Sequence, residues 1–551
     1  MKNNLSSQIV LSRVPSKLYR TTDPLELSRL TRREKIQTTI VENADEGCTL
    51  VSKLITERVQ QASSKSFTIA LSTGKSLVDI RQAIASLQTQ VRFINWQDGL
   101  LSNDEPLDLL VIGLGSLGQI GGQGIRSMLN AKEVILVAWG EHKAQALLDA
   151  IEGEVKDSSP ASKLQYHKSV QIVCDLNAAA LLTRIQRPWL VTQCDWDDQL
   201  SRRAIVWLCQ QTGKSILKLT NKDYDNNGLN ELVVLYGSAY NCNIKVFNDI
   251  QHTITGWPGG KPNADDSNRP ERANPYPKDI LIFSPHPDDD VISMGGTFAR
   301  LIKQGHNVHI AYETSGCIAV ADENLQYFLD FNNGLPQVLN NKKISTGDQP
   351  LSIQDFSSRE ILDLKALIRR GEATAACRYM GLDTSHIHFL NLPFYETGTI
   401  KKGDLSQRDV EIVKKLLLEI RPQEMFVAGD LADPHGTHKV CLDAVLAAID
   451  ELKDHESWLR ECRVWMYRGA WMEWDVDLIE MAVPMSPEEL RSKRNTILRH
   501  QSQMESAPFM GDDERLFWQR AEDRNHATAE LYAKLGLADY EAIEAFVQYR
   551  F

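Results

Sequence analysis

The chain has 551 residues, of which 42% are hydrophobic and 24% are charged, and its net charge is −12. This ordinary globular composition excludes disordered and fibrous classes for the chain as a whole. An acidic excess also argues against a nucleic-acid surface spread over the molecule, because phosphates are bound through Lys and Arg. At roughly 150 residues per domain, the length predicts about three or four domains.

Nine cysteines are scattered along the chain and none forms a Cys-x-x-Cys pair. This pattern is typical of reduced thiols, so we expect a cytoplasmic protein. The first 20 residues lack the apolar core that a signal peptide needs. No run approaches 18 consecutive apolar residues, so we expect no membrane partner.

The first half of the chain alternates apolar strands with helical patterns. Residues 24–62 are predicted to be helical, and strands are predicted at 67–71, 107–112 and 134–139, with a helix at 143–151. Glycine-containing loops follow the first two strands. The alternation predicts an open α/β sheet whose ligand sites lie at the carboxyl ends of its strands.

The second half shows the same alternation of strands and helices after an irregular segment. Residues 184–255 indicate mixed strands and helices, and 256–278 concentrate Pro, Gly, Asn and charge. Further on, strands are predicted at 279–284, 307–312, 387–390 and 425–428, and helices at 291–304 and 359–380. We therefore predict two doubly wound, mostly parallel, Rossmann-like α/β domains at 1–183 and 279–551, joined by a bridging module at 184–255 and a Pro/Gly-rich linker at 256–278.

Three acids and a histidine crowd the loop after the strand at 279–284. His286, Asp288, Asp289 and Asp290 stand where this strand ends and a helix begins. Grouping like charges is unfavourable unless a cation or a helix N-terminus compensates them. His286 and Asp289 are three residues apart, close enough for both to turn towards one ion and leave Asp288 facing a water molecule.

A second cluster contains Asp433, His435 and His438 and follows the strand at 425–428. Two parallel strands that end side by side would bring both clusters together. Together they offer the three His and carboxylate ligands of a catalytic Zn²⁺ site, and iron or cobalt fits such a set as well. The alternative is that the acids only cap a helix and the histidines are ordinary loop residues.

The two clusters resemble the signatures of the PIG-L/LmbE family of zinc-dependent N-deacetylases, which remove acetyl groups from N-acetylglucosamine units. The resemblance covers about residues 279–510 and includes Gly295-Gly296 after the first cluster. It implies that His286, Asp289 and His438 are the zinc ligands. It also implies that Asp288 is the general base and that His435 stabilises the oxyanion and protonates the departing amine.

Supporting positions of the same family lie further along the chain. The resemblance implies substrate-binding roles for Arg369, Glu372 and His500. The chain departs from the family pattern at Asp290, where Glu is usual, and at Pro285, where Ala is usual. Because Asp290 is one methylene shorter than Glu, any hydrogen bond made by the acid at this position must have a different geometry. The inferred metal ligands are unchanged.

The first half resembles glucosamine-6-phosphate deaminase/isomerases over about residues 35–182. In that family a Thr-Gly-x-Ser loop and a lysine hold the sugar phosphate, which implies the same role here for a set of five residues: Thr73, Gly74, Lys75, Ser76 and Lys143. The catalytic Asp and His of the family are replaced by Leu117 and Gln119. We therefore predict a degenerate domain that is either a sugar-phosphate pocket or a plain scaffold.

The leading hypothesis is a metal-dependent hydrolase that deacetylates an N-acetylglucosamine-type amino sugar or its conjugate. A second is a non-catalytic sensor of amino-sugar phosphates. A third is that the first half still deaminates glucosamine 6-phosphate. The expected partner is a small amino sugar or sugar conjugate, and the sequence leaves homo-oligomerisation open.

Overall fold

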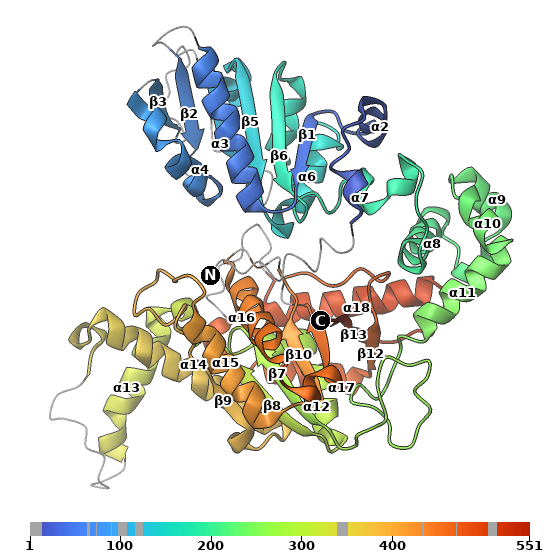
Figure 1. Ribbon diagram of the computed structural model, residues 1–551. Helices are drawn as coiled ribbons and strands as arrows, with labels where there is room; N and C mark the ends of the chain where they lie inside the picture. The colour runs from blue at the N-terminus through green and yellow to red at the C-terminus, as the bar shows by residue number, and fades with distance from the viewer. Residues whose placement is uncertain are drawn as a thin grey trace. The chain divides into compact units, whose positions relative to one another are not determined.

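The computed structural model describes residues 14–62, 67–72, 74–89, 91–96, 107–115, 125–338, 351–431, 433, 435–469, 471–504 and 515–551. They form two compact units, which comprise the described residues up to 196 and those from 197 onward. Figure 1 shows that each unit contains a sheet with flanking helices. None of the described helices has the length and apolar character needed to cross a membrane.

The N-terminal unit contains a six-stranded sheet in the order β1-β6-β5-β4-β2-β3, with every pairing parallel. Its strands are β1 (Gln37–Val41), β2 (Thr68–Ser72), β3 (Arg92–Trp96), β4 (Leu109–Gly113), β5 (Glu133–Ala138) and β6 (Val170–Asp175). Its α-helices are α2 (Pro24–Leu30), α3 (Ala44–Gln61), α4 (Val78–Ala83), α5 (Ile125–Asn130), α6 (Ala144–Ile151) and α7 (Thr183–Gln186).

Strand β4 explains why this sheet is covered on both faces. Its residues Leu110 and Ile112 belong to one apolar cluster, and Leu109 and Val111 belong to another. A parallel strand buried on both faces is a continuous apolar run, and this made β4 and β5 recognisable in the sequence. The prediction of an open parallel sheet is confirmed for this unit.

The predicted continuous helix at 24–62 is wrong. Strand β1 separates α2 from α3, and its β-branched run Thr38-Thr39-Ile40-Val41 favours a strand. Because β1 is an edge strand paired only with β6, its sequence is half polar and lacks the apolar run of the central strands. Strands β3 and β6 were not predicted either.

The C-terminal unit contains a seven-stranded sheet in the order β12-β13-β11-β10-β7-β8-β9. The strands are β7 (Asp279–Ser284), β8 (Asn307–Tyr312), β9 (Ile387–Phe389), β10 (Glu424–Ala428), β11 (Arg463–Tyr467), β12 (Met481–Met485) and β13 (Ala542–Tyr549). Strand β13 is antiparallel to both of its neighbours, and the other pairings are parallel. The predicted strands at 279–284 and 307–312 are confirmed with the same bounds, and the predicted fold class is confirmed for the chain.

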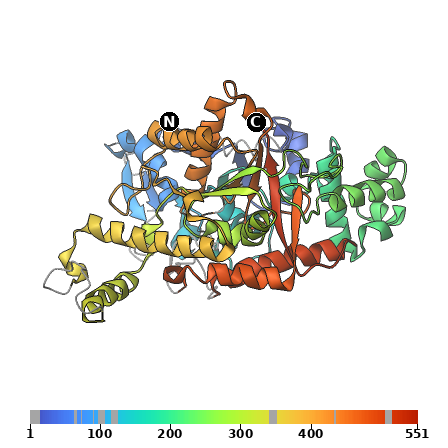
Figure 2. The same cartoon turned by 90° about the horizontal axis from the view of Figure 1, so that it is seen from below.

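Two helical layers enclose this sheet, one with α15 and α16 and the other with α12, α14, α17 and α18 (Figures 1 and 2). The α-helices of the unit are α8 (Asp198–Thr212), α9 (Asn221–Asn226), α10 (Asn230–Tyr236), α11 (Ala239–Gln251), α12 (Asp289–Lys303), α13 (Asp322–Val338), α14 (Ser358–Met380), α15 (Gln407–Ile420), α16 (Thr437–Leu452), α17 (Pro487–Ile497) and α18 (Phe517–Lys534).

Residues 184–255 contain helices and turns, and the strands predicted there are absent from this fully described range. Helices α8 to α11 belong to the C-terminal unit. The irregular segment 256–278 also lies within that unit, where Lys278 Nζ donates to the carbonyls of Gly259 and Arg272, each at 2.5 Å. The division between the compact units therefore falls at 196/197, before the helical module, and not at the Pro/Gly-rich segment.

Candidate active site

Strand β7 lies between β8 and β10 and is parallel to both. The chain runs from β7 through α12 to β8 on one side, and β10 lies on the other side, which makes the carboxyl end of β7 a topological switch point. Helix α12 begins directly after β7, and α16 begins after the loop that follows β10. The prediction that these two strands end side by side is confirmed.

The loop after β7 is held by hydrogen bonds to its own acids. Ser284 Oγ donates to the carbonyl of His286 at 2.6 Å and accepts from the amide of Asp290 at 3.1 Å. The Asp290 carboxylate accepts from Tyr312 Oη at 3.2 Å and lies 3.2 Å from Ser284 Oγ. Burial raises the pKa of Asp290 to about 7. The shorter acid at 290 therefore has its own set of partners.

The glycine pair of the first signature lets α12 approach β12 and α17. A side chain at Gly296 would place its Cβ 2.3 Å from Met485 Sδ, and one at Gly295 would come within 3.3 Å of Lys493 Cγ. The amide of Gly296 donates to buried Glu544 at 2.9 Å, and Lys493 Nζ pairs with the same carboxylate at 2.8 Å. The signature glycines thus fix the helix that carries the acids.

His286, Asp289 and His438 converge on one point. Asp289 Oδ2 lies 3.0 Å from His286 Nδ1 and 3.1 Å from His438 Nε2, and one ligand atom from each residue lies within 4.8 Å of the other two. Although burial opposes it, the neighbouring carboxylates of Asp289 and Asp433 raise the pKa of His438 to about 10. Two imidazoles and a carboxylate in this negatively charged setting fit a divalent cation.

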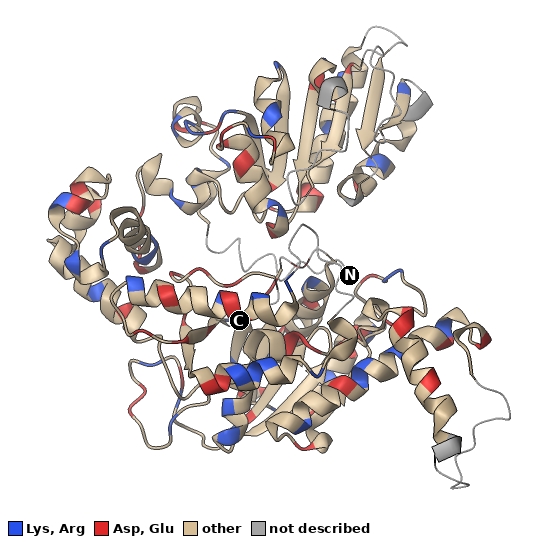
Figure 3. Ribbon diagram, turned by 180° about the vertical axis from the view of Figure 1, so that it is seen from behind, with Lys and Arg blue, Asp and Glu red and all other residues tan. Residues whose placement is uncertain are grey.

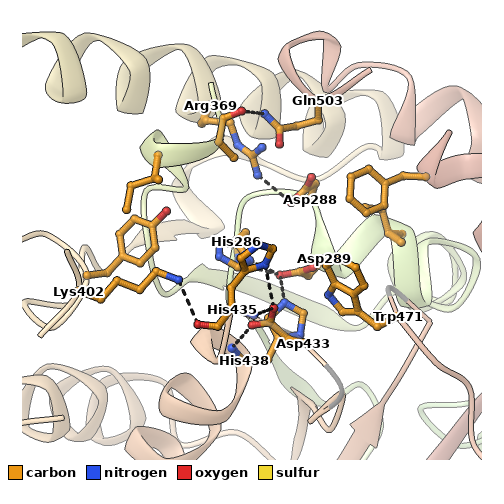
Figure 4. Close-up of a pocket in the computed structure, with 15 residues that line it drawn as sticks. His286, Asp288, Asp289, Arg369, Lys402, Asp433, His435, His438, Trp471 and Gln503 are labelled. Carbon is orange, nitrogen blue, oxygen red and sulfur yellow. Dashed lines mark hydrogen bonds and ion pairs between the residues drawn. The ribbon is translucent and has the colours of Figure 1, made fainter. Parts of the chain in front are cut away.

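Asp288 faces the same pocket with Arg369 of α14 as its partner (Figure 4). Arg369 Nη2 donates to Asp288 Oδ1 at 2.7 Å, and both side chains are buried. Burial raises the pKa of Asp288, and the Arg369 charge opposes that rise. Arg369 Nε and Nη1 have no hydrogen-bond partner among the described residues, so the guanidinium can bind a further acceptor.

Gly316 leaves room for this guanidinium. Its φ of +64° favours glycine, and a Cβ there would lie 3.0 Å from Pro287 Cδ and 3.2 Å from Arg369 Nε. A side chain at 316 would therefore displace Arg369 or the loop that carries Asp288.

Asp433 holds both histidines of the second cluster. Its Oδ1 lies 3.2 Å from His435 Nδ1 and accepts the amide of His435 at 2.8 Å, while Oδ2 accepts the amide of His438 at 3.1 Å. The His435 side chain is 44% exposed, whereas that of His438 is 2% exposed. The two histidines therefore differ in access: His438 lies within the site and His435 at its mouth.

A pocket of about 170 Å³ joins these groups. Apart from the residues already named, it is lined mainly by apolar and aromatic side chains, together with a lysine and an amide: Ile292, Ile318, Ala319, Tyr395, Lys402, Trp471, Gln503 and Phe517. Figure 4 shows Lys402 and Trp471 on opposite sides of the histidines. No sequence pattern predicted Tyr395, Lys402 or Trp471, because they stand in loops outside the two signatures.

Two residues expected to bind substrate are not among those that line the pocket. Glu372 accepts the amide and the hydroxyl of Ser502, each at 2.7 Å, and so anchors the turn that carries Gln503. His500 is fully buried, and burial lowers its pKa to about 3, which keeps the ring neutral. Arg369 does line the pocket.

Glu313 is a further buried acid beside the candidate metal ligands, and no pattern in the sequence predicted it. It follows β8 directly, and burial raises its pKa to about 8, although the nearby His438 opposes the rise. Its Oε1 has no hydrogen-bond partner among the described residues. A lone Glu after a strand matches no motif, and only the folded chain places it here.

The N-terminal unit has an analogous switch point between β2 and β4, which are parallel neighbours. Ser76 follows β2, and its carbonyl accepts Trp139 Nε1 at 3.0 Å. Lys143 is buried, and burial lowers its pKa. Gly74 is exposed, while Thr73, the side chain of Lys75, Leu117 and Gln119 lie outside the described residues.

The comparisons with known proteins agree with this division. Residues 281–449 match the family model described as PIG-L, GlcNAc-PI de-N-acetylase. The N,N'-diacetylchitobiose deacetylase from Pyrococcus horikoshii is 20% identical, with a TM-score of 0.32 and coverage of 49% of this chain and 84% of that one. The match to the family model shows that the C-terminal half contains a PIG-L domain, and it supports a deacetylase-type hydrolase.

The N-terminal half is similar to a different enzyme. The glucosamine-6-phosphate deaminase of Listeria innocua is 33% identical over 125 residues, which cover 15% of this chain and 53% of that one. The chain thus spans about half the length of this relative. A Bacteroides thetaiotaomicron protein described as glucosamine-6-phosphate deaminase-like is 48% identical, with 100% of both chains covered. The chain belongs to this family of glucosamine-6-phosphate deaminase-like proteins, which here combines a deaminase-like first half with a PIG-L domain.

Proposed function

We propose that the chain is a metal-dependent hydrolase that removes the N-acetyl group from an N-acetylglucosamine-type amino sugar or its conjugate. The observation that carries the proposal is the meeting of His286, Asp289 and His438 at one point, with Asp288 and His435 facing the same pocket. The PIG-L match over this region supports it.

The proposed cofactor is Zn²⁺, held by His286, Asp289 and His438. When bound, such an ion lowers the pKa of water towards neutrality and polarises a carbonyl oxygen. Asp433 orients the loop of His438 through its amide. This support outside the ligand set helps to fix ligand orientation.

Asp288 is the proposed general base. Arg369 holds its Oδ1, which leaves Oδ2 to accept a proton from the water that attacks the acetamide carbon. Burial of Asp288 raises its affinity for that proton, while Arg369 keeps the carboxylate charged before the attack.

His435 is the proposed acid for the second half of the reaction. Asp433 accepts a hydrogen bond from Nδ1, so Nε2 can carry the proton that passes to the amine nitrogen. The carbon–nitrogen bond then breaks, which releases acetate and the free amine. The exposed position of His435 at the pocket mouth suits a group that meets the departing amine.

The lining of the pocket supports a sugar substrate. Tyr395, Trp471 and Phe517 offer flat apolar surfaces to the C–H faces of a pyranose ring. Arg369 and Gln503 offer N–H donors to its hydroxyl oxygens. This pairing of apolar walls with a few donors is typical of small-ligand sites.

A panel of N-acetylated compounds tests the proposal. We expect the zinc-loaded full chain to release acetate from at least one of N-acetylglucosamine, its 6-phosphate, a chitobiose-type oligosaccharide or a lipid-linked conjugate. Absence of acetate from every member, with zinc bound at one equivalent, would contradict the proposal. The responsive member identifies the substrate class.

A further inference from the structure

A second pocket in the C-terminal unit is rich in arginine. It has a volume of about 500 Å³, and five arginines line it against two carboxylates, Asp249 and Glu480. The arginines come from α8, the 256–278 segment, β11 and the residue after β13: Arg202, Arg269, Arg272, Arg463 and Arg550. Along most helices of this acidic chain, acidic and basic residues are interspersed (Figure 3). A group of five arginines around one pocket is therefore unusual for this chain.

This arginine pocket is separate from the candidate active site. Arg463 is the first residue of β11, which is parallel to β10, whereas the His435 and His438 loop follows the last residue of β10. Trp465 of β11 is paired in register with Gln548 of the neighbouring strand β13, and both residues line the pocket. The two pockets have no lining residue in common, and Arg463 lies at the amino end of β11, whereas the candidate active site lies at the carboxyl ends of β7 and β10.

The acids at the arginine pocket already have partners. Glu480 pairs with Arg550 at 2.6 Å and accepts the amide of Gln548 at 2.7 Å, and Asp249 pairs with Lys245 at 2.8 Å. Among the five arginines, Arg550 alone forms an ion pair with a described carboxylate. Asp266, Glu271 and Glu424 also attract the charges of Arg269 and Arg463, so nearby acids offset part of the positive charge of the pocket.

Backbone carbonyls fix the four remaining guanidinium groups. Arg202 donates to the carbonyl of Ile479 at 3.1 Å, Arg269 to that of Ile254 at 3.0 Å, and Arg272 to that of Asp266 at 3.1 Å. Arg463 donates to the carbonyl of Pro270. These acceptors are neutral, so they orient the groups without compensating their charge. The guanidinium groups are thereby arranged in advance, which reduces the ordering that a ligand must impose.

Two buried donors in the lining have no acceptor. Arg202 Nε and Trp465 Nε1 are without a hydrogen-bond partner among the described residues. An unsatisfied buried N–H is unfavourable, and an acceptor oxygen of a ligand would remove this cost. Burial and the charge of Arg272 also lower the pKa of Arg463, although Glu424 and Asp266 oppose the shift.

We propose that the arginine pocket binds a phosphate monoester of a small organic molecule. Arginine forks bind the oxygens of a phosphate in pairs, and neutral donors such as an indole N–H add to them. The volume falls within the range of small-ligand pockets and exceeds the need of inorganic phosphate alone. An adjoining pocket of about 190 Å³ shares Arg272 and Arg463 and adds two basic residues, Lys278 and Arg421, together with two acids, Glu424 and Glu461.

Calorimetric titration of the full chain with glucose 6-phosphate, adenosine 5′-monophosphate and inorganic phosphate tests this site. We expect at least one ester to bind more tightly than inorganic phosphate. The ester with the higher affinity shows whether the site prefers a sugar phosphate or a nucleotide. The double variant Arg272→Gln/Arg550→Gln should weaken that binding about tenfold or more. No binding by any of the three probes overturns the proposal.

Three further variants make the result specific. Arg550→Gln alone changes an exposed residue at the end of the chain and should give a partial loss even if the double variant does not fold. Arg460→Gln removes an exposed arginine near β11 that lines neither pocket and should change nothing. The titrations are repeated in the Lys143→Met background, which removes the candidate phosphate-binding lysine of the N-terminal unit from the measurement. Full retention of binding in the folded double variant in that background would refute the assignment.

Discussion

The two sheets of this chain share a plan and differ at their switch points. In both, parallel strands diverge from a central position, at β2/β4 in one unit and at β7/β10 in the other. The loops after β7 and β10 contain carboxylates and imidazoles. The described residues that follow β2 and β4 directly, 74–77 and 114–115, contain neither. The fold thus supplies a place for a site in each unit, and the side chains decide whether chemistry can occur there.

Buried charge is used differently in the two units. In the C-terminal unit, Asp288 and Asp289 face a pocket and are balanced by Arg369 and the histidines. In the N-terminal unit, buried Asp175 at the end of β6 accepts the amides of Gly140 and Ala178, at 3.0 Å and 2.8 Å, and so serves the backbone. The comparison predicts hydrolysis in one unit and at most ligand binding in the other.

Replacement of Asp288 by Asn should have the largest effect, because it should abolish most of the hydrolytic activity that distinguishes the C-terminal unit. The variant keeps the size of the side chain and removes the proton acceptor, so we expect acetate release to fall by about a thousandfold. Zinc content, measured by mass spectrometry of the purified protein, should stay at one equivalent. Asp454→Asn, at an exposed position after α16, is the matched control. An active Asp288→Asn enzyme would refute the role of the base.

Replacement of His438 by Ala should instead remove the metal. His438 supplies one of three proposed ligands, so we expect the zinc stoichiometry to fall well below one equivalent and acetate release to fall with it. His455→Ala, which changes an exposed histidine beyond α16, should retain both. Full zinc occupancy in His438→Ala would show that the ion is held elsewhere.

The N-terminal unit should bind without catalysing. We expect no release of ammonia from glucosamine 6-phosphate by the native chain, because the family's acid and histidine are replaced by Leu117 and Gln119. Lys143→Met should weaken binding of this compound about tenfold in the Arg272→Gln/Arg550→Gln background and leave acetate release unchanged. Ammonia release at an enzymatic rate would contradict the prediction that the N-terminal unit does not catalyse. Unchanged binding in Lys143→Met would favour the interpretation of this unit as a plain scaffold.

The smallest expected effect concerns Glu424, a buried acid at the start of β10. Both of its oxygens lack hydrogen-bond partners among the described residues, its nearest ion-pair contact is Lys278 Nζ at 4.0 Å, and burial raises its pKa to about 7. Since the folded state holds this proton more tightly than the unfolded state, stability should fall as the pH rises from about 4.5 to 7.

Glu424→Gln should therefore raise the melting temperature at pH 8 by a few degrees and leave it nearly unchanged at pH 4.5. Differential scanning calorimetry at both pH values measures the difference. Glu461→Gln, at an exposed position near the same strand ends, serves as the control. An equal shift at both pH values would show that packing, and not titration, is responsible.

Prediction from the sequence worked best where the signal was local. The central strands β4, β5, β7 and β8 are continuous apolar runs, and each was predicted within two residues of its bounds. Strands β1, β3, β6, β11, β12 and β13 were missed, and for β1 and β13 the pairing depends on partners distant in the chain. Strand β13 pairs with β11 and β12, about 60 to 80 residues earlier.

The sequence by itself determined the two short signatures, and therefore the groups His286, Asp289 and His438, because each signature fits one strand-to-helix junction. Only the tertiary structure decided which side chains complete the site. Arg369 reaches Asp288 across 81 positions, and Trp471 and Lys402 meet the pocket from loops without a motif. The arginine pocket is likewise assembled from segments more than 300 residues apart. Such contacts arise from the packing of helices and strands, which local residue patterns do not encode.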